Sequence, residues 1–174
     1  MAIDNKGSPD KAQRFPTEAA LVESFVEKLE KGRTRYGRVE IATEWDHRSG
    51  LVDVLARDSR GSLLAFEAKL DNWRRAVEQA YRNTAYANQV YVLLPPAVAR
   101  RAMQYREQFE LRGIGLCSFN GRFTRVLIEA LDHDALLTWV RARAHEHFDS
   151  VANERNAPAR LAAGRGRNLQ SARA

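Results

Sequence analysis

Residues 50–81 read GLVDVLARDSRGSLLAFEAKLDNWRRAVEQAY, and the rest of the chain can be interpreted outward from them. Two apolar runs, 51–57 and 62–70, are separated by the polar turn sequence DSRG at 58–61. Each run is too short for a confident helix and is bounded by turn residues. The pattern therefore predicts the two strands of a β-hairpin.

The turn determines which side chains of the two strands face each other. If residues 59–61 form a three-residue loop, Gly61 takes the left-handed position and closes a G1 bulge. Asp53 then falls directly opposite Glu67 on the second strand. A loop one residue shorter or longer would put the two acids on opposite faces.

Three charged side chains, Asp53, Glu67 and Lys69, are therefore expected to converge on one patch of an otherwise apolar sheet. Buried carboxylates placed side by side repel each other and lose hydration, so they need a cation or strong donors nearby. Mg²⁺ meets that need with one or two carboxylates and keeps several waters for chemistry. The alternative is a salt bridge from Lys69 to either acid on a solvated sheet face, which is the common outcome for an isolated E-x-K pattern.

The helix predicted at 17–31 carries a further acidic candidate. Apolar residues at helical spacing follow Thr17, which is the expected N-cap. Glu18 lies on the core-facing stripe of this helix. It either complements the helix dipole or reaches the acidic cluster and helps to bind a metal.

A second helix is expected after the hairpin, capped by Asp71 or Asn72. Arg75, Gln79, Arg82 and Tyr86 fall on a polar face beside its apolar stripe, and an ordinary solvated face is the simple interpretation for the last two. The buried stripe itself is predicted to contain Trp73, Ala76, Val77, Ala80 and Thr84.

This order of residues resembles the PD-(D/E)XK nuclease superfamily. The resemblance rests on an acid in a first helix, Asp53 on one strand, Glu67-Ala68-Lys69 on the next, and a helix carrying Gln79. It covers roughly residues 18–95, and Val52 stands where the family often has a proline. It implies a restriction-endonuclease-like core.

The resemblance also implies a metal centre and roles for individual residues. The cofactor would be Mg²⁺, with Mn²⁺ as a substitute, and Lys69 would activate or orient the attacking water. Gln79 would contact the metal's water or the DNA near the site. The metal ligands implied are Asp53, Glu67 and Glu18, and the backbone carbonyl of Ala68 between the two functional side chains is a further candidate.

The remaining apolar runs predict an α/β domain with a mixed central sheet flanked by helices. A continuous apolar run at 89–94 is typical of a buried central strand, and Asn120-Gly121 is a strong hairpin signal. The other expected elements are strands at 39–45, 114–119 and 122–128, a helix at 97–111, and a last helix that opens at Asp132 with Leu136 and Leu137 on its apolar stripe.

The whole chain of 174 residues is long enough for one good core and too short for two ordinary domains. We expect a flexible N-terminus at 1–15, a single nuclease-like domain at 16–149 and a basic flexible tail at 150–174. The tail holds five arginines and one glutamate, and the formal net charge of the chain is +6. Its single cysteine, the absence of a long apolar run and the polar N-terminus make a cytoplasmic protein the default expectation.

The expected function is a metal-dependent endonuclease that hydrolyses phosphodiester bonds, in DNA rather than RNA. Arg35, Arg48 and Arg75 are the arginines expected to contact the nucleic acid, although charged loops are commonly just solvated. One alternative is a non-catalytic nucleic-acid-binding or assembly module with the same fold. Another is a subunit that is active only with partners, and a homodimer is a further expectation because it would supply two cuts.

Overall fold

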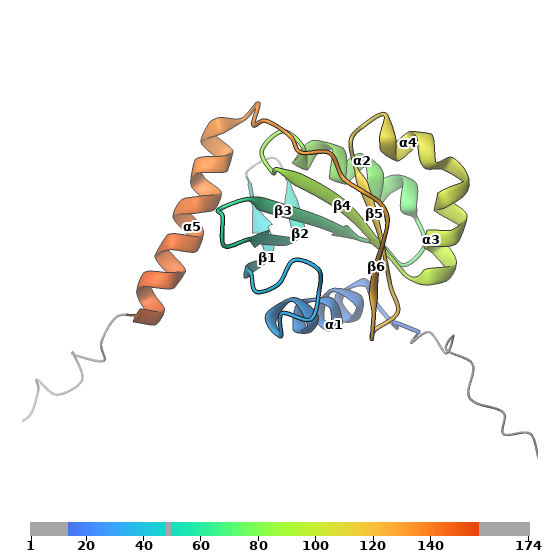
Figure 1. The fold of residues 1–174 in the computed structure, drawn as a ribbon, viewed down its shortest axis with the longest axis horizontal. Coiled ribbons are helices and arrows are strands. Elements are labelled where there is room, and N and C mark those ends of the chain that lie inside the picture. The colour runs from blue at the N-terminus through green and yellow to red at the C-terminus, as the bar shows by residue number, and fades with distance from the viewer. Residues whose placement is uncertain (1–13, 48–49, 157–174) are drawn as a thin grey trace, which may run out of the picture.

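The computed structural model describes residues 14–47 and 50–156, and a six-stranded sheet organises them (Figure 1). The strands follow one another in sequence order across the sheet, from β1 to β6. The β3–β4 and β4–β5 pairs are parallel and the other three pairs are antiparallel, so the sheet is mixed as predicted. The elements are α1 Glu18–Glu30, β1 Glu40–Asp46, β2 Leu51–Arg57, β3 Leu63–Ala68, α2 Trp73–Asn83, β4 Gln89–Leu94, α3 Pro96–Ala102, a 3-10 turn η1 at Met103–Tyr105, α4 Arg106–Glu110, β5 Gly115–Phe119, β6 Thr124–Ile128 and α5 Thr138–Asn156.

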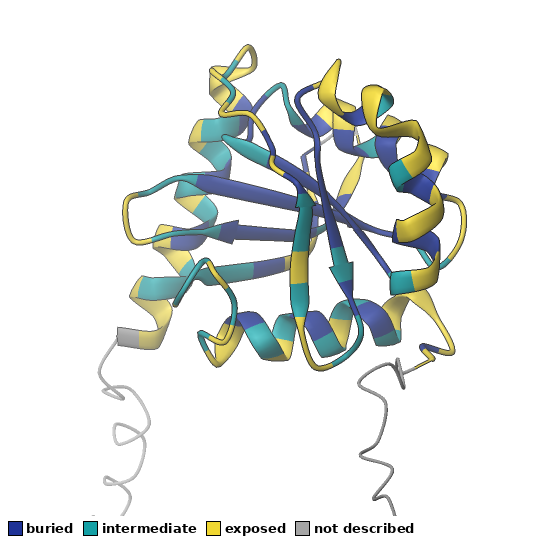
Figure 2. Cartoon of the chain, turned by 45° about the vertical axis from the view of Figure 1, so that its right-hand side comes forward, coloured by how far each residue is buried: buried dark blue, intermediate teal, exposed yellow. Residues whose placement is uncertain are grey.

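Helices cover both faces of the sheet and create two apolar clusters. On one face, Leu21, Phe25 and Leu29 of α1 pack on alternate residues of the central strands. On the other face, apolar side chains of α2, α3, α4 and α5 are buried against the sheet. Strands β3 and β4 are buried along almost their whole length (Figure 2), in agreement with their largely apolar sequences, and Glu67 in β3 is the one charged residue of the two strands. The layered α/β architecture is consistent with a restriction-endonuclease-like core.

The register predicted for the central hairpin is confirmed. Val54 pairs with Phe66, and the ladder continues in step to the turn. The Asp58 N–H donates to the Ser62 carbonyl at 3.0 Å, and Gly61 has a φ of +85°, a conformation that favours glycine. The three-residue loop is therefore the one that closes this hairpin.

The N-caps of two helices agree with the prediction from sequence, whereas one predicted helix does not. Thr17 caps α1 through a hydrogen bond of 3.1 Å from the Ala20 N–H, and Asn72 caps α2, both as expected. The single helix predicted at 97–111 is wrong, because a 3-10 turn divides that segment into α3 and α4.

The last helix begins later than predicted, at Thr138 instead of Asp132. The backbone before it is held elsewhere: the His133 N–H donates to Asn88 and the Leu137 N–H to Ala85, so these groups are not available to a helix. Leu136 is strongly exposed.

Helix α5 continues through Ser150 to Asn156, and the remainder of the expected tail lies outside the described residues. Within the described ranges, no helix combines the length and apolar character needed to cross a membrane.

Candidate active site

Asp53 lies where the regular pairing of β2 with β3 stops. The last paired residues at this end are Val54 and Phe66. The next residue on β2 uses its side chain: Asp53 Oδ2 accepts a hydrogen bond of 2.8 Å from the Ala68 N–H. A carboxylate that accepts a backbone N–H is held in one orientation. Asp53 is therefore fixed beside the segment that carries Glu67 and Lys69.

A backbone irregularity in β1 faces Asp53. Glu44 has a φ of +51°, in the left-handed region that costs a residue with a Cβ on the order of 1 kcal/mol. The strand alternation breaks there, because Ala42 and Trp45 are three residues apart and still pack in the same core cluster. Strained residues of this kind cluster at functional sites, and this one brings another carboxyl group toward Asp53.

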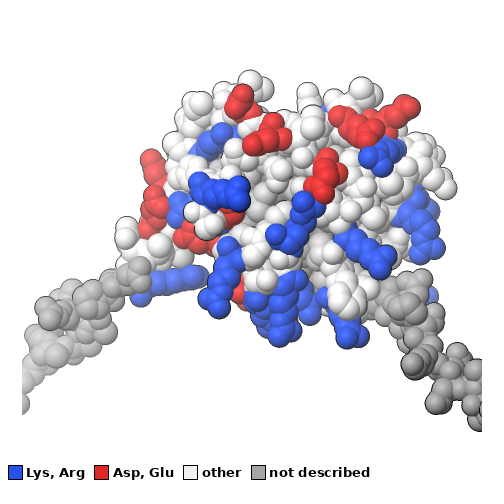
Figure 3. All heavy atoms as spheres, viewed as in Figure 1, with Lys and Arg blue, Asp and Glu red and all other residues white. Residues whose placement is uncertain are grey.

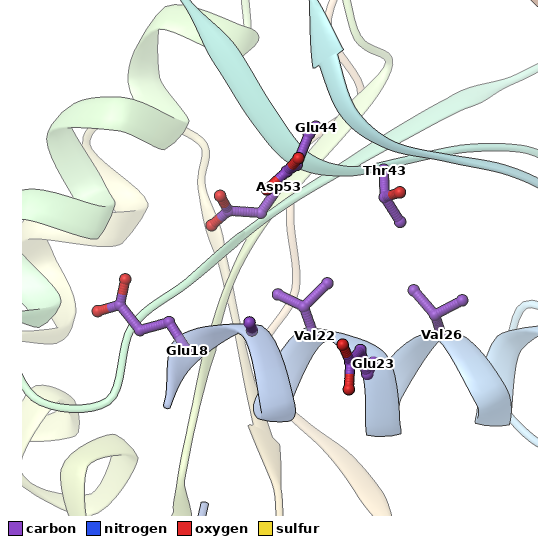
Figure 4. A pocket seen from close by; sticks show the side chains of 8 residues that line it. Glu18, Val22, Glu23, Val26, Thr43, Glu44 and Asp53 are labelled. Carbon is purple, nitrogen blue, oxygen red and sulfur yellow. The ribbon is translucent and has the colours of Figure 1, made fainter. Parts of the chain in front are cut away.

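A groove of about 550 Å³ separates α1 from the edge of the sheet at this point. Figure 4 shows Glu18 on α1 and Asp53 on β2 at the same end of it. Glu23 and Glu44 add two acidic side chains that the sequence did not single out. The groove is lined by Glu18, Ala19, Val22, Glu23, Val26, Thr43, Glu44 and Asp53.

The ammonium group of Lys69 links the acidic residues of this site. Lys69 Nζ donates to Glu18 Oε2 and to the backbone carbonyl of Ala68, each at 2.9 Å, and it lies 4.0 Å from Asp53 Oδ2. Its side chain is only 12% exposed. Glu18 therefore does reach the Asp53 cluster. Lys69 approaches Asp53 only at 4.0 Å, its shorter ion pair is with Glu18, and its burial differs from the solvated sheet face of the salt-bridge alternative.

Glu67 is held from the opposite side, by α2. It is 1% exposed, and its Oε1 accepts a hydrogen bond of 2.7 Å from Asn83 Nδ2. The Asn83 side-chain carbonyl in turn accepts from the Tyr86 hydroxyl at 3.2 Å. The other carboxyl oxygen, Glu67 Oε2, is buried and has no hydrogen-bond partner among the described residues. One oxygen is thus oriented by the protein while the other is left unsatisfied.

Burial disfavours the ionised form of both strand carboxyl groups, those of Asp53 and Glu67. It raises the pKa of Glu67 to about 8, the nearby Asp53 raises it too, and the hydrogen bond from Asn83 opposes the rise. Burial also raises the pKa of Asp53, against the lowering effects of the Ala68 N–H and of Lys69. Near pH 7, Glu67 is mostly protonated unless a cation or donor compensates its charge.

Two residues that orient Glu67 were missed by the sequence reasoning. The predicted stripe of α2 included Thr84, whereas the buried position is Asn83, three residues after Ala80. The helical period places position 83 on the buried stripe, but its polar side chain is atypical of an apolar stripe. Tyr86 was assigned to the solvated face of the helix and is fully buried, because α2 ends before it.

The other predicted site residues are placed less closely. Gln79 is half-buried on α2, and its Oε1 is a second buried atom that has no hydrogen-bond partner among the described residues. Arg75 is exposed in the first turn of α2. Arg35 forms an ion pair with Glu129. Arg48 lies outside the described residues.

Replacing Asn83 tests whether the α2 network holds Glu67. We expect Asn83→Ala to lower the free energy of unfolding by about 1–3 kcal/mol, because it leaves a buried carboxyl oxygen and a buried hydroxyl without partners. Urea denaturation at pH 7 measures this. Tyr86→Phe removes only the distal hydrogen bond and should cost about 1 kcal/mol or less. A loss for Asn83→Ala no larger than that for Thr84→Ala, at the half-buried C-cap of the helix, would contradict the assignment.

The donors at this site suit a hard divalent cation in type, although they are not arranged as a cluster of acids. In the part of the chain that the structure describes, no three His, Cys, Asp or Glu side chains are placed together to hold a metal ion. Mg²⁺ commonly uses only one or two carboxylates. The unsatisfied Glu67 Oε2 and the Asp53 carboxylate are of the right chemistry, as is the Ala68 carbonyl.

Comparisons with known proteins bear on the fold more than on the chemistry. No family model matches the chain, and no curated protein matches it. Among solved structures, a protein of unknown function from Silicibacter pomeroyi has a TM-score of 0.57 at 14% identity, over 86% of this chain and 96% of that one. A repair endonuclease from Pyrococcus abyssi has a TM-score of 0.36 at 18% identity, over 55% and 46%. The first likeness shows a shared fold alone, and the second is too distant to carry an argument.

Proposed function

We propose that this protein is a Mg²⁺-dependent nuclease that hydrolyses phosphodiester bonds in DNA. The observation that carries the proposal is a buried Glu67 with one oriented oxygen and one unsatisfied oxygen, next to Asp53 and Lys69. A protein seldom places a buried carboxyl group beside a half-buried one without a compensating role. A hard cation would satisfy both of them.

The residues that would hold the metal are Asp53 and Glu67, with the Ala68 carbonyl and Glu18 as further donors. When bound, Mg²⁺ would supply a Lewis acid for the scissile phosphate. Asp53 is already oriented by the Ala68 N–H, and Glu67 is oriented by Asn83. The chain therefore preorganises two donors, one on β2 and one on β3, which reduces the cost of assembling the site.

Lys69 and Gln79 are the residues proposed to act on the reacting groups. The Lys69 ammonium would hold the attacking water or offset the negative charge that develops on the phosphate. The half-buried amide of Gln79 has an unsatisfied oxygen that could accept a hydrogen bond from water. Together they would position the water and stabilise charge, the two tasks that phosphoryl transfer asks of protein groups.

A second candidate is a nucleic-acid-binding or assembly module that keeps the fold without cleaving, or a subunit that is active only with partners. The salt bridge between Lys69 and Glu18 favours this second candidate, because the lysine is already paired with an acid. Such a module would need basic surfaces but not the buried acids.

A cleavage panel separates the two candidates. Linear, nicked, branched and single-stranded DNA and RNA are incubated with the protein and Mg²⁺ or Mn²⁺, with EDTA as the control. The nuclease predicts products that disappear in EDTA. An inert protein that still shifts nucleic acid in a gel would support the binding module or the partner-dependent subunit.

A further inference from the structure

Two short cationic segments lie outside the acidic site and are not explained by it. Residues 31–38 read KGRTRYGR, with four basic residues and no acidic one, and 120–125 read NGRFTR at the tip between β5 and β6. Arg33, Arg38 and Arg122 are exposed and make no ion pair with another described residue. A set of unpaired arginines is the electrostatic signature of an anion-binding surface.

The fold places residues 31–38 against β5 and the end of β6, the two strands that are joined by the tip at 120–125. Arg35 pairs with Glu129 just after β6, and the Tyr36 hydroxyl lies 3.9 Å from Cys117 Sγ on β5. The Tyr36 ring also packs edge-on against Phe66. Figure 3 shows Lys and Arg side chains gathered along the lower part of this face, over α1 and the loop after it, whereas Asp and Glu lie mostly toward the upper and left parts.

The β5–β6 tip presents an aromatic ring to solvent. Phe123 is 58% exposed, and the Arg122 guanidinium lies 5.1 Å from the centre of its ring. Asn120 Oδ1 accepts hydrogen bonds from the backbone N–H groups of Arg122 and Phe123, at 2.9 and 2.7 Å. The ring is therefore presented by a closed turn, and ordering it on a ligand would cost little.

This tip is anchored next to α1, the helix that carries Glu18. Phe119, one residue before the tip, stacks on Phe15 at 5.8 Å and contacts Phe25 of α1 at 5.6 Å. Helix α1 has 13 residues and is about 20 Å long. It therefore spans from Glu18 in the groove to the 31–38 loop, a distance of about six nucleotides for a strand that keeps the stacked spacing of B-DNA, roughly 3.4 Å each.

We propose that the 31–38 loop and the β5–β6 tip form a docking surface for a single-stranded segment of nucleic acid that leads toward the groove. Phe123 stacks on an unpaired base, and Arg33, Arg38 and Arg122 contact phosphates. An exposed ring favours unpaired strands because bases inside a duplex already stack on each other, while any unpaired base offers a free face. The proposal rests on the proposed function for its ligand class, and it names the preferred substrate as one with unpaired nucleotides.

Binding measured in EDTA tests this surface without cleavage. Fluorescence anisotropy compares a labelled forked duplex with a blunt duplex of the same length. We expect Phe123→Ala to weaken binding of the fork by about tenfold or more, to leave the blunt duplex nearly unchanged, and to be rescued by Phe123→Tyr. Trp139→Ala, which removes another exposed aromatic ring, is the matched control. Arg33→Ala and Arg38→Ala should each lower the slope of log affinity against log salt by about 0.7.

The outcomes separate this proposal from the proposed function. Equal binding of the fork by wild type and Phe123→Ala, or equal losses on fork and duplex, would overturn the docking surface even if the protein cleaves. Selective loss on the fork would support the surface even if no substrate is cut.

Discussion

Lys69→Ala is expected to bind Mn²⁺ or Mg²⁺ about ten- to hundredfold more tightly than the wild-type protein, and to cleave at least about a hundredfold more slowly. The two effects have opposite signs because Lys69 has two roles. Its ammonium group contacts the Ala68 carbonyl and Glu18 and approaches Asp53, which are three of the donors proposed for the metal. A divalent cation must displace it from these oxygens. Charge-assisted hydrogen bonds of this kind are worth about 1.5–3 kcal/mol, which sets the size of the gain in affinity.

Calorimetric titration with Mn²⁺ measures the affinity, and single-turnover cleavage measures the rate. Arg106→Ala is the matched control, because Arg106 also pairs with a glutamate, Glu110, but outside the groove and the proposed docking segments. An unchanged or weaker metal affinity in Lys69→Ala would show that the ammonium group does not compete for the metal's position.

Without metal, the wild-type protein is expected to lose stability as the pH rises. Glu67→Gln is expected to remove this loss. The pKa of Glu67 is about 8 in the folded chain and near 4.5 when unperturbed, so the folded state binds more protons between these values. Stability is then fully present below about pH 4.5 and declines as the pH rises toward 8, by several kcal/mol (on the order of 4). Asp53, whose pKa is also raised, adds to the decline. A neutral amide at position 67 has no charge to bury.

Urea denaturation from pH 5 to 9 compares Glu67→Gln with wild type at each pH, which cancels groups common to both. One such group is His47, whose pKa burial lowers. Glu23→Gln, at an exposed acid in the groove beside Asp53, should follow the wild-type curve. Added Mg²⁺ should restore wild-type stability more at pH 8 than at pH 6, because it needs the ionised carboxylate. A flat wild-type curve would contradict the assignment of Glu67 as a buried acid.

The hairpin and the central sheet could be predicted from local chemistry. The DSRG turn with its glycine determined the register, and the continuous apolar run at 89–94 indicated a central strand. The start of the last helix is predicted too early. The backbone N–H groups of His133 and Leu137 donate to residues that are distant in sequence, and no local sequence pattern encodes these hydrogen bonds.

The site was predictable in composition but not in its contacts. Asp53, Glu67, Lys69 and Glu18 stand out from the chemistry of buried charge and from the family resemblance. The role of Asn83 depends on which turn of α2 faces β3, and the presence of Glu44 depends on a local left-handed backbone. Both are tertiary features that strand and helix periods do not specify.

The most direct test of the central claim is single-turnover hydrolysis of the preferred substrate in Mg²⁺ by Asp53→Asn, with Glu23→Gln as the matched control in the same groove. Asn is nearly isosteric and can still accept the Ala68 N–H, so the fold should be retained while the charge is lost. We predict that Asp53→Asn lowers the rate by at least about a hundredfold and that Glu23→Gln remains within about threefold of wild type. Equal rates for Asp53→Asn and wild type would contradict the account of Asp53 as a metal-binding catalytic acid.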